Sequence, residues 1–75
     1  MKIKTTAEKV NEAIEKMREI GSVEIKGSTG FFDVKGVEGR FVFDQGTGVL
    51  DITIDDKPWL ATDSMIESEV RKFFS

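Results

Sequence analysis

The chain has 75 residues, of which 39% are hydrophobic and 33% are charged, and a chain this short buries only about 60% of its unfolded surface, so residues 1–75 are expected to form one domain. Eleven basic and fourteen acidic residues are scattered along it, which gives a net charge of −3 without the basic stripe that a nucleic acid partner requires. The absence of cysteine excludes disulfides, thiolate metal sites and a cysteine nucleophile.

The N-terminal segment MKIKTTAEKV becomes polar after a single isoleucine. It lacks the apolar core of an export signal, and no segment approaches the roughly 18 apolar residues of a membrane span. The sequence therefore predicts a cytoplasmic protein without a membrane span.

A helix is predicted over residues 6–20, because its apolar side chains recur every three or four positions and share one face. Thr5 and Glu8 have the spacing of a capping box at its start, and Gly21 suits a left-handed stop at its end. The apolar positions are Val10, Ala13, Ile14, Met17 and Ile20.

From Ser22 the apolar period changes to two, which is typical of strands. Connections at residues 27–30, 36–39 and 45–48 separate four predicted strands, with the turn between the second and third placed at GVEG, residues 36–39. Connections this short indicate an antiparallel meander, since a parallel crossover needs about a dozen residues. The inward side chains are Val23, Ile25, Phe32, Val34, Phe41, Phe43, Leu50, Ile52 and Ile54.

A second helix is predicted after Pro58, with capping-box spacing at Ser64 and Glu67. The expected fold class is α+β, a single small domain of order α-β-β-β-β-α. Its four-stranded antiparallel meander sheet carries both helices packed on one face. The apolar face of this helix contains Ile66, Val70, Phe73 and Phe74.

Residues for catalysis are few, because histidine, cysteine and tyrosine are all absent. Four aspartates near the end of the last strand offer oxygen ligands for a hard cation, but their spacing matches no calcium loop. We expect them to be solvated, and we expect no catalytic residue, no metal site and no cofactor. These aspartates are Asp51, Asp55, Asp56 and Asp63.

The outer face of the sheet offers one candidate interaction surface. Phe31, Val42 and Val49 are out of phase with the inward sets, so they are expected to point away from the helices. They form either a docking or homodimer face, or scattered surface residues without a role.

Two aromatic residues near the C-terminus are further candidates. Trp59, between Pro58 and Leu60, either covers the core or anchors a partner. Phe73 and Phe74 are not expected both to face inward fully, so Phe74 is also a candidate contact residue.

The segments FFDVKGVEGRFVF, VLDITI and MIESEVRKFF resemble the small bacterial polyhydroxyalkanoic acid system proteins, the granule-region family. The family commonly has a histidine near its N-terminus, whereas this chain has none. The resemblance implies a cytoplasmic accessory protein of storage-polyester granules, with no catalytic residues to carry over. The matching positions are Phe32, Gly36, Val37, Gly39, Leu50, Ile52, Ile66, Glu67 and Val70.

The expected function is that of a non-catalytic accessory or binding module, which docks through its outer sheet face on a hydrophobic granule surface or a protein partner. One alternative is a homodimeric interaction protein. Another is a small hydrolase or isomerase that uses carboxylates such as Asp51 and Asp55, for which the core is expected to leave little room for a cavity.

Overall fold

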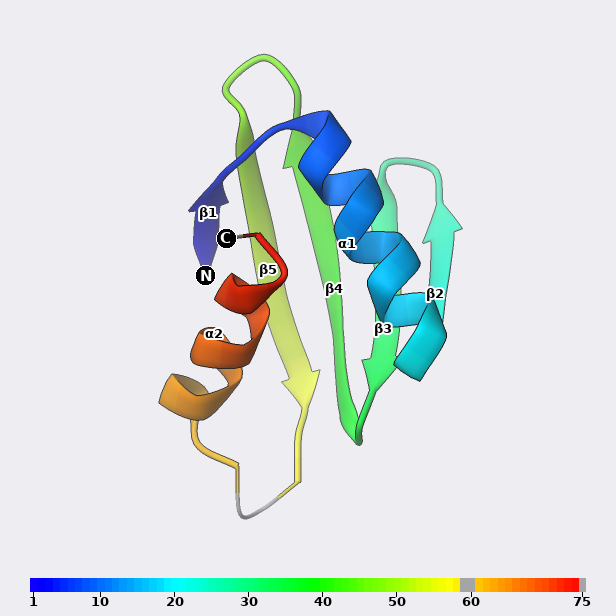
Figure 1. The fold of residues 1–75 in the computed structure, drawn as a ribbon, viewed down its shortest axis with the longest axis vertical. Coiled ribbons are helices and arrows are strands. Elements are labelled where there is room, and N and C mark those ends of the chain that lie inside the picture. The colour runs from blue at the N-terminus through cyan, green and yellow to red at the C-terminus, as the bar shows by residue number, and fades with distance from the viewer. Residues whose placement is uncertain (59–60, 75) are drawn as a thin grey trace.

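The computed structural model describes residues 1–58 and 61–74, which form five strands and two helices (Figure 1). The predicted α+β class is confirmed. In chain order the elements are β1 (Lys2–Lys4), α1 (Ala7–Ile20), β2 (Gly21–Lys26), β3 (Thr29–Val34), β4 (Val37–Asp44), β5 (Val49–Asp56) and α2 (Asp63–Lys72).

The strands form one antiparallel sheet in the order β1-β5-β4-β3-β2. The strands β2 to β5 make the predicted meander, but the prediction of four strands is wrong, because β1 adds a fifth at the edge. Ile3 of β1 is buried and lies opposite Leu50 of β5. A segment of three residues with one apolar side chain produces too short a pattern to indicate a strand.

The turn between β3 and β4 begins one residue earlier than the predicted turn and is shorter. Val34 pairs with Val37, so the turn consists of Lys35 and Gly36, whose φ angles are 53° and 80°. Two positive φ angles are typical of a type I′ hairpin turn, which matches the twist of the strands it joins. The predicted turn at GVEG is therefore wrong, and Gly39 lies within β4.

Two cross-strand pairs of a glycine with a phenylalanine join β3 to β4. Gly30 lies opposite Phe41, and Phe32 lies opposite Gly39. A Cβ atom on Gly30 would lie 2.2 Å from Cζ of Phe41, and one on Gly39 would lie 2.6 Å from Cζ of Phe32. Each ring therefore extends over the glycine of the neighbouring strand, and the two rings stack with their centroids 6.3 Å apart.

The ends of α1 differ from the prediction in both caps. The N-cap is Thr6 instead of Thr5, and its hydroxyl accepts a hydrogen bond of 3.2 Å from the backbone N–H of Lys9. Gly21 has extended backbone angles and begins β2, so the helix passes into the strand without a loop. A Cβ atom on Gly21 would lie 2.4 Å from the carbonyl oxygen of Asp33, so close strand pairing requires glycine here.

The second helix begins earlier than the Ser64 capping box predicts. Its N-cap is Thr62, whose hydroxyl accepts a hydrogen bond from the backbone of the first turn. Ile66 is buried, and Val70 and Phe74 pack against the core cluster. Neither helix of the described residues is long and apolar enough to cross a membrane.

The two helices pack on the sheet unequally, which corrects the predicted packing. The backbone of α1 lies close to β2 and β3, whereas α2 approaches no strand of the described chain to the same extent. Figure 1 shows the two helix axes well separated across the width of the sheet. The side chains of α2 thus reach the core while its backbone stands apart.

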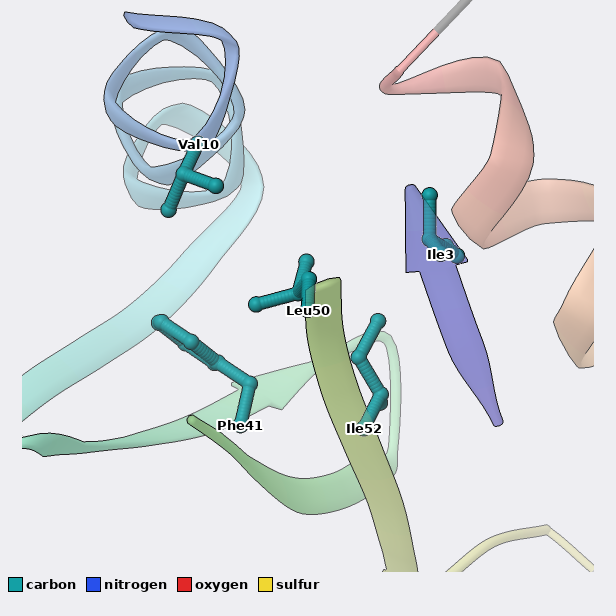
Figure 2. Close-up of a cluster of buried hydrophobic side chains, with 5 residues drawn as sticks. All are labelled: Ile3, Val10, Phe41, Leu50 and Ile52. Atoms are coloured by element: carbon teal, nitrogen blue, oxygen red, sulfur yellow. The ribbon is translucent and has the colours of Figure 1, made fainter. Parts of the chain in front are cut away.

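The buried core cluster combines side chains from β1, α1, β4 and β5 (Figure 2). Phe41 is buried as predicted, while Phe32, Val34 and Phe43 are only half-buried. The N-terminal strand thus contributes to the core although the sequence pattern does not reveal it. The cluster contains Ile3, Val10, Phe41, Leu50 and Ile52.

We predict that Gly39→Ala destabilises the protein by about 1–3 kcal/mol, the usual cost of overpacking. The added methyl group would meet the carbonyl oxygen of Thr53 at 2.5 Å as well as the ring of Phe32. Urea unfolding measures the change, with the exposed loop variant Gly46→Ala as the control that stays within about 0.5 kcal/mol of the original chain. Equal stability of the two variants would contradict the close approach at Gly39.

Candidate functional site

An apolar hollow of about 310 Å³ lies between α1, α2 and the inward side of the sheet. The same apolar stripe that defines α1 in the sequence forms one wall, and the apolar face of α2 forms another. The carbon-lined wall includes Ala13, Ile14, Met17 and Ile20 of α1, Phe32, Val34, Val37, Phe41, Leu50 and Ile52 of the sheet, and Met65, Ile66, Val70, Phe73 and Phe74 at the C-terminal end.

Two large aromatic side chains form the part of the wall that the sheet contributes. The rings of Phe32 and Phe41 lie over Gly39 and Gly30 of the neighbouring strands, and both rings contribute to the wall of the hollow. The neighbouring wall positions Ala13 and Ala61 carry only a methyl group. The expectation that the core leaves little room for a cavity is therefore wrong.

Two charged residues line the hollow, Lys35 from the β3–β4 turn and Glu69 from α2. A carboxylate oxygen of Glu69 lies 3.1 Å from the ammonium nitrogen of Lys72, so the acidic group already has a cationic partner. Within residues 1–58 and 61–74, Lys35 makes no ion pair or side-chain hydrogen bond. The hollow thus combines an apolar wall with one cation that no acidic side chain neutralises.

Sequence reasoning missed Lys35 because a lysine in a hairpin has no chemical signature of its own. The available signal was the dipeptide Lys35-Gly36 between two apolar runs, which is compatible with a two-residue turn. Such a turn places Lys35 next to Val34, whose side chain belongs to the inward set and lines the hollow.

The predicted outer patch is present as a broken row. Phe31 and Val42 are each 41% exposed, but neither they nor Val49 lie directly opposite one another. Polar or charged residues separate the three, which makes them diagonal neighbours and not a continuous apolar face. Across the strands, Phe31 lies opposite Glu24 and Arg40, Val42 opposite Thr29 and Asp51, and Val49 opposite Lys4 and Asp44.

Of the two aromatic candidates near the C-terminus, the structure describes only Phe74. Trp59 lies outside the described residues. Phe74 is half-buried, packs against the core cluster and lines the hollow together with Phe73. Both phenylalanines line the hollow while each is only half-buried, and Phe74 belongs to a different surface from Phe31.

The candidate carboxylates are exposed and do not converge. Asp55 pairs with Arg40 at 2.9 Å, Asp63 pairs with Lys57, and Asp51 lies on the outer face of β5 beside Val42. In the part of the chain that the structure describes, no three acidic, histidine or cysteine side chains are grouped to hold a metal ion. Asp51 and Asp55 thus share no enclosed site with the hollow.

In comparisons with known proteins, no family model, no curated protein and no solved structure matches the chain. The resemblance to the polyhydroxyalkanoic acid system proteins therefore stays a prediction.

We predict that Val70→Phe raises the melting temperature, because the larger side chain buries additional apolar surface in the hollow, at about 25 cal/mol per Å². Differential scanning calorimetry measures the change, and Val42→Phe on the outer face is the control with little effect. In a filled core the same substitution would overpack and cost about 1–3 kcal/mol. A destabilised Val70→Phe variant would therefore contradict an open hollow.

Proposed function

We propose that this chain is a non-catalytic binding module that takes up the apolar part of a small molecule in the hollow between α1, α2 and the sheet. The observation that carries the proposal is the hollow itself. Its volume of about 310 Å³ falls at the lower end of the range for small-molecule sites, roughly 300–1,000 Å³. A site of this size accommodates a small ligand and not a bulky polycyclic one.

The chemistry of the wall favours binding over catalysis. Among the described residues that line the hollow, Lys35 and Glu69 are the ionisable ones, and no serine, threonine or aspartate joins them. General acid–base or nucleophilic catalysis requires a reactive group within hydrogen-bond reach of a bound substrate. The wall instead supplies carbon surface, which binds by removing apolar area from water. We also propose that this module is located in the cytoplasm.

The expected selectivity follows from that driving force. Each buried methylene group contributes about 0.8 kcal/mol, which corresponds to roughly a fourfold gain in affinity. A flexible alkyl chain can follow the irregular wall formed by Ile14, Met17 and Val70, which a rigid ligand would have to match in shape. We therefore expect affinity to increase with chain length until the hollow is full.

A second proposal concerns the outer face, where Phe31 and Val42 expose large apolar side chains. This face would dock on an apolar surface, such as that of a storage-polyester granule, or on a second copy of the chain. The charged residues between the exposed side chains make the docking area discontinuous, which is why the hollow is the leading candidate.

The two proposals predict opposite effects for a pair of variants. Isothermal titration with a series of linear alkanols is expected to show binding that strengthens with chain length. Val70→Phe should weaken it, because the larger side chain takes up part of the hollow, whereas Val42→Lys should leave it unchanged. Loss of alkanol binding in a folded Val42→Lys variant, with retention in Val70→Phe, would contradict the hollow as the site.

The outer-face proposal has its own readout. Co-sedimentation with polyester granules, or a doubled mass in sedimentation equilibrium, is expected to disappear in Val42→Lys and to resist added salt, because apolar burial is not screened. Wild-type protein that neither co-sediments nor dimerises would contradict docking through the outer face, and it would not affect the proposal that the hollow binds a ligand.

A further inference from the structure

The position of Lys35 indicates what kind of head group a ligand of the hollow would carry. Lys35 lines the hollow from the β3–β4 turn, and it is flanked by Val34 and, across the turn, by Val37, which both line the hollow as well. A lysine in such a position places its methylene groups along the apolar wall and its ammonium group toward water. The cation therefore stands at the boundary between apolar surface and solvent.

The backbone at Lys35 is uncommon for its residue type. Its φ angle of 53° lies in the left-handed region, and the other positive φ angles among the described residues belong to glycines. Type I′ turns prefer asparagine, aspartate or glycine at this position. Positive φ at a side chain other than these is a mild strain, and strained residues occur preferentially at functional sites.

Of the two charged residues that line the hollow in the described part of the chain, Lys35 is the one whose charged group is available to a ligand. Glu69 is paired with Lys72 on α2. The three ion pairs of the described residues do not include Lys35. A carboxylate placed here would acquire a partner of opposite charge, whereas an ammonium ligand would meet a like charge.

We infer that the hollow binds a small amphiphile with a single negative charge, a medium-chain alkyl carboxylate, with the alkyl chain between α1 and α2 and the carboxylate beside Lys35. This inference rests on the function proposed above, because it assigns a head group to a ligand whose tail occupies the hollow. One lysine matches one negative charge, whereas a phosphate would call for further cations that the lining does not supply. With a net charge of −3 the chain as a whole repels an anion weakly, so a local cation such as Lys35 favours anion binding at this position.

The test compares three ligands with the same alkyl chain, namely octanoate, octanol and octylammonium. Isothermal titration at low ionic strength measures their affinities for the original chain, Lys35→Met and Lys35→Glu. Methionine keeps an unbranched apolar side chain in the same turn, so it removes the charge with little change in shape. Lys16→Met, on the exposed side of α1 and away from the hollow, is the control with the same change in net charge.

The expected result is a selective effect on the anion. Lys35→Met should weaken octanoate binding by about two- to fivefold, as expected for an exposed ion pair, and leave octanol binding unchanged. Lys16→Met should change neither. Lys35→Glu should shift the ratio of octanoate to octylammonium affinity by about fivefold or more toward octylammonium, and added salt should reduce this shift.

Other outcomes separate the head-group inference from the proposed function. If Lys35→Met weakens octanoate and octanol equally, Lys35 contributes only its methylene groups, and the inference is overturned while the hollow remains a binding site. If Lys16→Met weakens octanoate as much as Lys35→Met does, the effect is that of net charge and the inference again fails. If none of the three ligands binds the original chain, the proposed function falls with it.

Discussion

The pairing of two phenylalanines with two glycines across β3 and β4 is the contact on which the rest of the molecule depends. Gly30 opposite Phe41 and Phe32 opposite Gly39 let both rings lie over the neighbouring strand and stack on each other. This arrangement joins the two strands of the central hairpin, and it also brings Phe41 into the buried cluster with Val10 of α1 (Figure 2). The two rings therefore stabilise the sheet, and they also form part of the wall of the hollow between the sheet and the helices.

The two helices are connected to the sheet in different ways. The first helix is tied to it directly, because Gly21 both ends α1 and begins β2. The second helix follows a longer connection and reaches the core through side chains, with Ile66 as its buried residue. An apolar hollow lies between the two helices and the sheet, and Lys35 lines it from the β3–β4 turn.

The elements that could be predicted from the sequence are those with local, repeated signals. Val10, Ala13 and Met17 indicate α1 by spacing alone, and the period of two through Leu50 and Ile52 indicates β5. The N-terminal strand could not be predicted, because Ile3 acquires its burial only by pairing with a strand some fifty residues away. The hollow could not be predicted for a related reason. The sequence pattern shows which face an apolar side chain belongs to, but the direction in which Phe32 and Phe41 extend depends on glycines in the partner strand.

Isotope-filtered nuclear Overhauser spectra of labelled protein with unlabelled octanol would measure directly where an alkyl chain lies. Contacts from the chain to the methyl groups of Ile14, Ile66 and Val70, with none to Val42 on the outer face, are the expected result. They would place the chain between α1, α2 and the sheet. Contacts confined to Val42 and Val49, or no contacts at ligand concentrations that saturate comparable apolar sites, would contradict a binding function of the hollow.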